Sequence, residues 1–133
     1  FYQNLVPSTR QRLKCLGVIP DQEKNDLLAA TDVFALPSRI DSFGIVYLEA
    51  WANRKPVIGA RAGGVPDVID DGTDGVLVEF GDVEALAAAI ESLLADPSLR
   101  QRMGERGWEK VTECYTWDQV YSRLRAVYKE VLG

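Results

Sequence analysis

The sequence has 133 residues, of which 47% are hydrophobic and 26% are charged, and its formal net charge is −5. This composition is that of an ordinary globular protein, and the length suits one domain that buries about two-thirds of its chain surface on folding. Residues 41–96 carry 11 acidic and 3 basic side chains, so this acidic middle would repel a nucleic-acid backbone.

Other classes are excluded by what the sequence lacks. No stretch reaches the length of an apolar membrane-spanning helix, and Phe1 opens no signal peptide. Cys15 and Cys114 are expected to be buried free thiols in a reducing compartment. With no histidine and no cysteine cluster, neither a metal site nor a cofactor is expected. We therefore expect a cytoplasmic protein, or one attached peripherally to a membrane, and the missing start methionine indicates a piece of a longer chain.

The first part of the chain predicts one strand and one helix. Residues 1–11 show no clear period. Lys14–Ile19 is predicted as a strand, although it contains a glycine. Pro20 and Asp21 supply a turn and an N-cap for a helix over about Gln22–Thr31.

The central part predicts a strand, a helix and a second strand. Val33–Leu36 is a short apolar run, typical of a strand buried on both faces of a parallel sheet. After a polar loop, Phe43–Asn53 has helical apolar spacing, and Pro56–Gly59 is a second apolar run that leads to Gly63 and Gly64. This order indicates one crossover unit of a parallel sheet followed by a glycine loop.

The last part predicts one more strand and then three helices. Val76–Val78 is the strand, and a clear amphipathic helix runs from Asp82 to Pro97. Ser98–Cys114 has a weaker stripe, and the helix after Thr116 has an aromatic-rich stripe that we expect to be mostly core. With about four strands in all, we predict an α/β fold: a Rossmann-like parallel sheet with helices on both faces, ending in C-terminal helices.

The loop before the predicted helix at Phe43 is the candidate ligand site. In an open parallel sheet, the carboxyl ends of the strands bring their loops to one edge. The helix N-terminus at that edge presents unpaired N–H groups, which attract phosphate. Ser42 is placed to cap this helix, and Gly44 leaves its first turn uncovered, so that an anion can approach closely.

Two carboxylates frame this helix terminus. Asp41 lies just before the helix and Glu49 lies two turns inside it, on the face below Ser42. Carboxylates accept hydrogen bonds from sugar hydroxyls and repel phosphate, so the spacing suits a sugar nucleotide. The alternative is that Asp41 only caps the helix and Glu49 is solvated surface, and the spacing alone leaves both interpretations open.

Five segments carry a combined signature that is specific, although each is weak alone. They are Pro37-Ser38, Asp41 to Ala50, Lys55 to Ile58, Gly63 to Asp67, and Asp71 to Val78. Together they resemble the C-terminal, donor-binding lobe of group 1 retaining glycosyltransferases with the GT-B fold. The resemblance extends from about Leu16 to the C-terminus, and it implies that the lobe is truncated at its N-terminus.

The resemblance implies roles for the acidic residues. Glu49 matches the second acidic residue of the family, which binds the ribose hydroxyls of the nucleotide. Asp41 matches the first, a catalytic position against the donor sugar that is usually glutamate. Asp67 also stands where glutamate is commoner, which suggests a variant subfamily or neutral drift.

The resemblance also implies a set of donor-binding positions around the diphosphate. These are Ser42, Phe43, Gly44, Ile45, Gly63 and Gly64. Backbone N–H groups of the first loop would hold the diphosphate, and the glycine pair would lie beside the donor sugar. The lysine and arginine that clamp the diphosphate in the family are absent from these 133 residues.

Residues 1–133 are therefore expected to be a partial nucleotide-sugar-binding lobe. The parent enzyme would transfer a hexose from a nucleotide-diphosphate sugar to the hydroxyl of an unknown acceptor, and it would need its N-terminal lobe to be active. In the resembling family the last helix crosses back to that lobe, so its apolar face would lack a partner here and could support self-association.

Two alternatives remain open from the sequence. A sugar-nucleotide epimerase of the same fold would share the nucleotide site, and a non-catalytic interaction domain would have the Asp41–Glu49 spacing by accident. A dinucleotide-binding oxidoreductase fits less well, because Gly63-Gly64-Val65-Pro66 does not match its glycine fingerprint.

Overall fold

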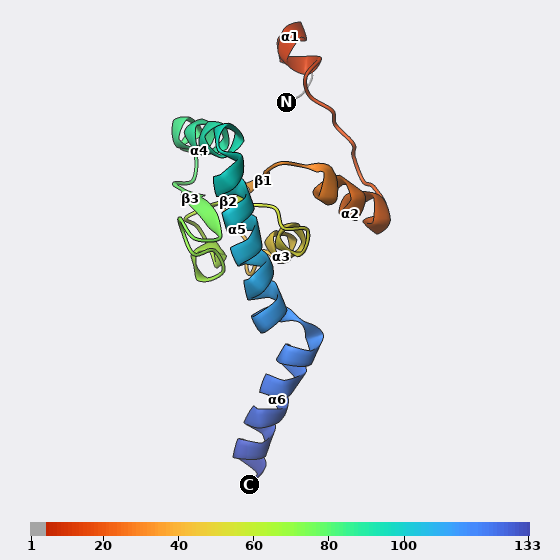
Figure 1. The fold of residues 1–133 in the computed structure, drawn as a ribbon, viewed down its shortest axis with the longest axis vertical. Helices are drawn as coiled ribbons and strands as arrows, with labels where there is room; N and C mark the ends of the chain where they lie inside the picture. The colour runs from red at the N-terminus through yellow and green to blue at the C-terminus, as the bar shows by residue number, and fades with distance from the viewer. Residues whose placement is uncertain (1–4) are drawn as a thin grey trace.

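The computed structural model describes residues 5–133, so the expectation for Phe1 lies outside the described residues. A small parallel sheet lies at the centre of the molecule with helices around it, and the last helix extends away from this body (Figure 1). The elements are α1 (Pro7–Arg10), α2 (Asp21–Ala30), β1 (Phe34–Leu36), α3 (Ile45–Ala52), β2 (Val57–Ala60), the 3₁₀ turn η2 (Val65–Asp67), β3 (Gly75–Val78), α4 (Val83–Ala95), α5 (Pro97–Lys110), the π-helical turn η3 (Val111–Tyr115) and α6 (Trp117–Leu132).

The described sheet has the order β1-β2-β3, and both pairs of strands are parallel. Phe34 lies opposite Val57, which in turn lies opposite Gly75. Because the strands run in the same direction, the loops that follow β1, β2 and β3 all leave from one edge. The predicted strand–helix–strand unit and the parallel sheet are confirmed.

The prediction of a strand at Lys14–Ile19 is wrong. The described residues therefore contain three strands rather than the predicted four. This segment is irregular and leads from α1, which stands apart from the body, to α2 (Figure 1). Gly17 has φ +67°, and Val18 is fully exposed. Cys15 in the same segment is also exposed, so the expectation that it is buried is wrong. A strand is stable only when its backbone groups pair with a neighbour and one face is buried, and this segment has neither among the described residues.

Helices cover both faces of the sheet, as predicted. Successive residues of β2 point to opposite faces. Val57 joins a core cluster with Tyr47 and Trp51 of α3, whereas Ile58 joins a second cluster with Leu93 of α4 and residues of α5. The two clusters hold the sheet between α3 on one side and α4 on the other, and α5 contributes to the second.

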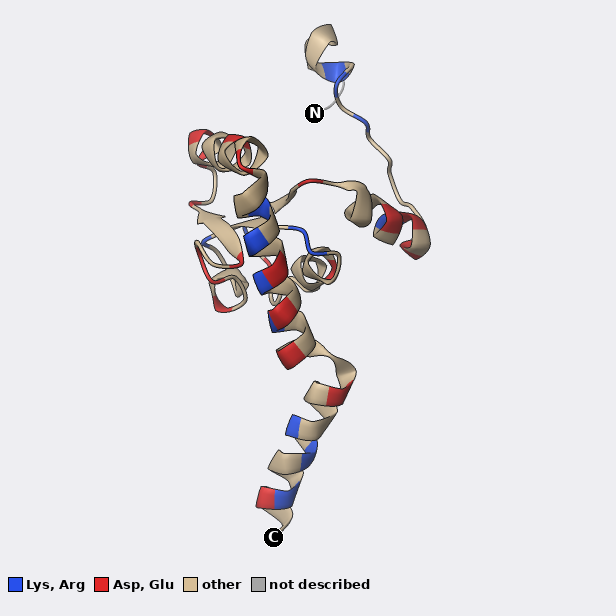
Figure 2. Ribbon diagram, in the orientation of Figure 1, with Lys and Arg blue, Asp and Glu red and all other residues tan. Residues whose placement is uncertain are grey.

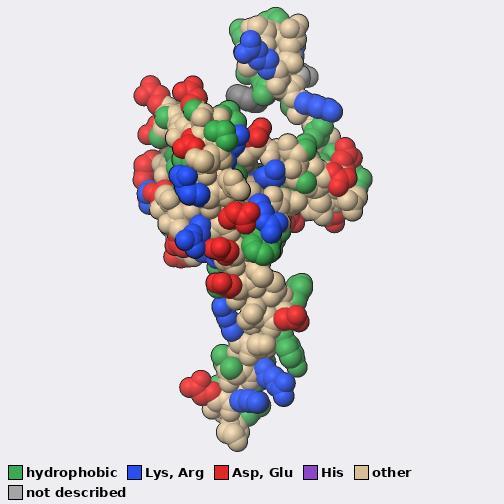
Figure 3. All heavy atoms as spheres, in the orientation of Figure 1, with side chains coloured by type: hydrophobic (Ala, Val, Ile, Leu, Met, Phe, Trp, Pro, Cys, Tyr) green, Lys and Arg blue, Asp and Glu red, His purple; other side chains and the backbone are tan. Residues whose placement is uncertain are grey.

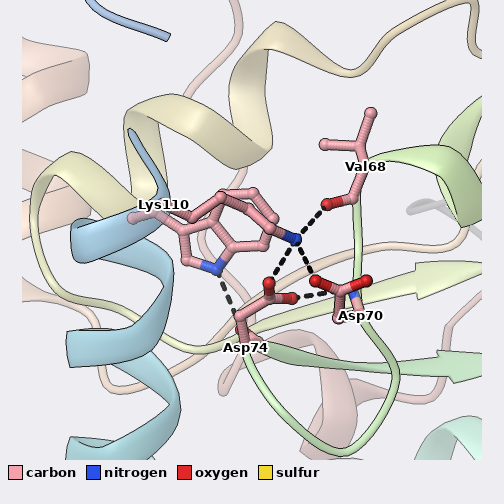
Figure 4. Close-up of polar contacts among 5 residues, drawn as sticks. Val68, Asp70, Asp74 and Lys110 are labelled. Carbon is pink, nitrogen blue, oxygen red and sulfur yellow. Dashed lines mark hydrogen bonds and ion pairs between the residues drawn. The ribbon is translucent and has the colours of Figure 1, made fainter. Parts of the chain in front are cut away.

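A cluster of ion pairs fastens α5 to the loop before β3 (Figure 4). Asp74 is only 1% exposed, and its carboxylate contacts the Lys110 ammonium. The same ammonium lies 2.8 Å from Asp70 Oδ2 and donates to the carbonyl of Val68 at 2.8 Å. Burial raises the pKa of Asp74 despite the hydrogen bond from Lys110. Burial also opposes the charge on Lys110, but the hydrogen bonds to Asp70 and Asp74 outweigh it and raise the Lys110 pKa.

The helical stretch predicted over Ser98–Cys114 is confirmed, although it changes from α-helix to π-helix near its end. Regular α-helix ends at Lys110, the π-helical turn η3 follows, and α6 begins at Trp117 in a different direction (Figure 1). Side chains of both charges lie along α6, and apolar side chains are visible on its surface (Figures 2 and 3).

The expectation that the stripe of α6 is mostly core is wrong for this chain. All its members are exposed, from 42% for Val120 to 87% for Trp117. They are Trp117, Val120, Tyr121, Leu124, Val127, Tyr128 and Val131. The stripe therefore has no partner among the described residues, as the resemblance implied.

Candidate functional site

The candidate site lies at the carboxyl edge of the sheet, where the loops after β1 and β2 meet. Gly64 N–H donates to the carbonyl of Asp41 at 2.8 Å. A Cβ atom on Gly63, which has φ +57°, would lie 2.5 Å from that same carbonyl oxygen, and one on Gly64 would overlap the carbonyl of Ser42. Only glycine allows the two loops to pack this closely. The structure thus brings together the two loops that the sequence predicted as one site.

Asp41 caps its own loop. Its Oδ1 accepts hydrogen bonds from the N–H groups of Phe43 at 3.1 Å and Gly44 at 2.6 Å. The prediction that Ser42 caps the helix is wrong, because α3 begins at Ile45 and Gly44, with φ +71°, is its N-cap residue. Asp41, rather than Ser42, makes the capping hydrogen bonds, because its carboxylate reaches the N–H groups two and three residues ahead.

These hydrogen bonds bear directly on the predicted phosphate site. The N–H groups of Phe43 and Gly44, which were predicted to hold a diphosphate, already hold an anionic oxygen in this structure. The two N–H groups therefore point to one position that suits an anion, and the Asp41 carboxylate occupies that position. This contact supports the interpretation of Asp41 as a cap without assigning it any role toward a ligand.

Tyr47 of α3 packs against this loop, a role that was not predicted from the sequence. Its hydroxyl donates to the carbonyl of Leu36 at 2.6 Å, and its ring packs edge-to-face on Phe34. A Cβ atom on Gly44 would overlap the Tyr47 ring. Burial, together with the nearby charge of Asp41, raises the pKa of Tyr47 to about 12. The only sequence signal for this contact is the three-residue spacing between Gly44 and Tyr47 at the start of the helix.

Glu49 is not free at the surface. Its Oε1 lies 2.8 Å from the ammonium of Lys24, which comes from α2. The hydrogen bond to Glu49 is the largest cause of a raised pKa at Lys24. Glu49 is therefore a partly exposed member of a surface ion pair, and the contact does not place a nucleotide beside it.

The turn between α5 and α6 also reaches the loop. The ring of Tyr115, in η3, meets the ring of Phe43 edge-to-face, with centroids 5.6 Å apart and planes inclined by 74°. Nothing in the local sequence pattern indicates this contact, since the two residues are 72 positions apart. The turn from which α6 leaves the body therefore packs directly against the candidate loop.

A shallow pocket lies at the same edge of the sheet, between the ends of β1 and β3. It has a volume of about 160 Å³, and the guanidinium of Arg39 lies 6.0 Å from the centre of the Phe80 ring beside it. Its lining residues are Pro37, Val78, Glu79, Phe80, Gly81, Asp82, Val83 and Leu86. The acidic residues here are already in contact with protein groups, because Asp82 caps α4 and Glu79 lies 3.6 Å from Arg61.

Two kinds of feature are absent from residues 5–133. No described helix is both long enough and apolar enough to cross a bilayer. No cluster of three or more histidine, cysteine or acidic side chains has the arrangement of a metal site in that part of the chain.

Comparison with known proteins places this geometry in context. Residues 8–110 match the family model described as "Glycosyl transferases group 1". The chain is 42% identical, over 80% of its length, to N-acetyl-alpha-D-glucosaminyl L-malate synthase of Bacillus anthracis. It is 40% identical, over 88% of its length, to D-inositol 3-phosphate glycosyltransferase of Corynebacterium diphtheriae. The matched parts make up 28% and 27% of those two proteins, so the chain spans less than a third of such relatives.

Solved structures share the arrangement of the elements. Sucrose-phosphate synthase from Thermosynechococcus elongatus matches 92% of this chain with a TM-score of 0.83 and 30% identity, over 31% of its own length. Anabaena HepE, solved in complex with UDP and glucose, matches 92% of this chain with a TM-score of 0.82 and 25% identity, over 33% of its own length. The Rossmann-like lobe predicted from the sequence is confirmed by these likenesses.

Proposed function

Because the chain belongs to the group 1 glycosyltransferases, we propose that it is the donor-binding lobe of an enzyme that transfers a hexose from a nucleotide-diphosphate sugar to an acceptor hydroxyl. One observation supports this proposal above the others: the loop after β1 and the glycine pair after β2 pack together at the carboxyl edge of the sheet. Ligands of open parallel sheets bind at that edge. The solved complexes of Anabaena HepE with UDP and UDP-glucose support a nucleotide sugar as the donor.

The diphosphate is assigned to the N–H groups at the start of α3. Phe43 and Gly44 now donate to the Asp41 carboxylate, so a bound diphosphate replaces that carboxylate and turns the Asp41 side chain away. The displaced side chain then accepts hydrogen bonds from hydroxyls of the donor sugar, which Gly63 and Gly64 approach from the other loop. One movement thus binds the phosphate and places the catalytic carboxylate.

The leaving group is the nucleoside diphosphate, and the protein stabilises its developing negative charge. Backbone N–H groups that already point at an anion need no reorganisation as the bond breaks, which is the basis of this kind of catalysis. The described site has no lysine or arginine on the first loop apart from Arg39, which lies against Phe80. The remaining cations are assigned to another part of the parent protein, and the transfer is proposed to retain the anomeric configuration.

Glu49 is assigned to the ribose of the donor nucleotide. Its carboxylate lies in the second turn of α3, beyond the N–H groups that would hold the diphosphate, and it faces α2 through Lys24. A carboxylate accepts hydrogen bonds from two vicinal hydroxyls, and this geometry suits a ribose.

The N-terminal lobe of the parent enzyme is proposed as the partner of α6. The exposed aromatic stripe of α6 supports this, because such a continuous apolar face is usually covered. The free thiols of Cys15 and Cys114 support a cytoplasmic location for the enzyme. The isolated lobe is expected to be inactive, since the acceptor is assigned to the other lobe.

The test is a binding titration of the full-length protein with UDP, GDP and ADP, followed by their hexose conjugates. We expect one nucleotide to raise Tm and to bind more weakly to Glu49→Gln. The control is Glu91→Gln, on the exposed face of α4. If none of the three nucleotides binds, the proposal is wrong. Release of an epimerised or hydrolysed sugar without an acceptor would instead favour the epimerase alternative.

A further inference from the structure

The ammonium of Lys24 is the one described cation in contact with Glu49. Lys24 lies in the first half of α2, and its Nζ is 2.8 Å from Glu49 Oε1 and 3.4 Å from Asp21 Oδ1. The contact joins two helices across 25 residues of sequence. It is therefore a tertiary contact, unlike the pairing of Lys24 with Asp21 one helical turn away.

The ion pair leaves half of the Glu49 carboxylate available. Oε1 accepts from Lys24, and no described protein group donates to Oε2. The Glu49 backbone carbonyl is held in turn by the side-chain amide of Asn53 at 3.0 Å. A long, flexible side chain that is held at one oxygen presents its other oxygen in a limited range of directions, and a ligand hydroxyl then loses less entropy on binding.

We propose that Lys24 is a positioning residue: it holds Glu49 Oε1 so that Oε2 accepts a hydrogen bond from a ribose hydroxyl of the donor nucleotide. This inference rests on the proposed function, because it needs a nucleotide at Glu49. It adds that α2, which packs beside α3, determines how well the site recognises the ribose. Lys24 itself contacts no reacting atom.

The exposure of the pair makes the proposal testable. The side chains of Lys24 and Glu49 are 35% and 31% exposed, and ion pairs this accessible contribute little to folding. Removal of the ammonium should therefore leave the fold intact. An effect on binding can then be separated from an effect on stability, which Tm measures independently.

The experiment measures Kd of the full-length protein by calorimetry for UDP, GDP and ADP, and for the 2′,3′-dideoxy form of the nucleotide that binds. For Lys24→Met we expect Kd for the ribonucleotide to rise about fivefold, with Kd for the dideoxy form unchanged. Lys24→Arg should restore binding to within about twofold, because it also donates to a carboxylate. The control is Lys55→Met, at the opposite edge of the sheet before β2.

Each other outcome contradicts the inference in a recognisable way. If the unaltered protein binds none of the three nucleotides, the proposed function fails and this inference fails with it. If Lys24→Met binds the ribonucleotide as well as or better than the unaltered protein, only this inference fails. If the variant loses equal affinity for the ribo and dideoxy forms, Lys24 acts through its charge on the phosphates and does not position Glu49.

Discussion

Gly107 of α5 lies directly against the indole ring of Trp51 in α3, so closely that a Cβ atom at position 107 would overlap the ring. Trp51 is fully buried and its Nε1–H donates to the carbonyl of Asp74 at 2.9 Å, so the ring has no freedom to move. The helix α5 can pass this close to α3 because Gly104, one turn earlier, fits in the same way against the carbonyl of Arg54, just after α3.

This contact predicts that Gly107→Ala destabilises the protein. Helix propensity alone favours alanine by about 1 kcal/mol, whereas an added methyl group in a tightly packed core costs about 1–3 kcal/mol. We expect the second effect to win and the free energy of unfolding to fall, as measured by urea denaturation. Gln101→Ala, on the exposed side of the same helix, is the control and should change stability little. A more stable Gly107→Ala variant would show that α5 can move away from Trp51.

A second prediction concerns the ion pair between Lys110 and the buried Asp74. Lys110→Met removes the ammonium and leaves the buried Asp74 carboxylate without its cation. The loss of one partner of a buried pair costs about 3–5 kcal/mol. Addition of Asp74→Asn should recover much of this loss, because the amide needs no counter-charge. If the double variant is as unstable as the sum of the single variants, the two side chains do not act as a pair.

Stability should also fall at high pH. The pKa of Tyr47 rises from its ordinary value of 10.0 to about 12, so the folded state holds the phenolic proton more tightly than the unfolded state does. Stability from such a group is complete below pH 10 and is lost as the pH rises toward 12. The raised pKa of Lys110 acts in the same direction above pH 10.5. Urea denaturation at a series of pH values between 9 and about 12 measures this loss.

Tyr47→Phe is the matched variant for this pH dependence. It keeps the ring against Phe34 but removes the hydroxyl that donates to Leu36. At neutral pH it should cost about 1 kcal/mol for the lost hydrogen bond, and above pH 10 its stability should fall less steeply than that of the unaltered protein. An identical alkaline slope would mean that the pKa of Tyr47 is the same in the folded and unfolded states.

The side chain of Asp41 should affect binding and turnover in opposite directions. Asp41→Ala frees the N–H groups of Phe43 and Gly44, so UDP, GDP or ADP should bind more tightly, while sugar transfer by the full-length protein should fall. Asp41→Asn still offers an oxygen to both N–H groups and should bind nucleotide much as the unaltered protein does. Weaker nucleotide binding by Asp41→Ala would show that the carboxylate does not compete with the phosphate.

The last prediction tests whether the turn between α5 and α6 supports the candidate loop. Tyr115→Leu removes the ring that packs on Phe43. Aromatic pairs contribute about 0.5–1.5 kcal/mol beyond their buried area, so nucleotide binding should weaken about two- to tenfold. Tyr115→Phe keeps the ring and should bind normally. If both variants bind normally, the turn and the loop are independent.

The sequence predicted the central elements well because their signals are local. Short apolar runs at β1, β2 and β3 and helical spacing at α3 and α4 identify secondary structure without knowledge of any distant residue. The strand at Lys14–Ile19 was wrong because a strand depends on a neighbour to pair with, and no local pattern shows whether that neighbour is present. The change from α-helix to π-helix at η3 had no signal in the helical stripe, whereas Thr116 correctly indicated the start of α6.

The same distinction holds for the site. The order of the strands and the positions of Asp41, Gly63 and Gly64 are enough to place both loops of the candidate site at one edge of a parallel sheet. The contacts of the site residues follow only from the packing of the folded chain: Lys24 at Glu49, Tyr115 at Phe43, and the Asp41 side chain on its own loop. Such contacts join residues far apart in the chain or depend on one side-chain rotamer, and they follow from packing distances that no periodicity in the sequence encodes.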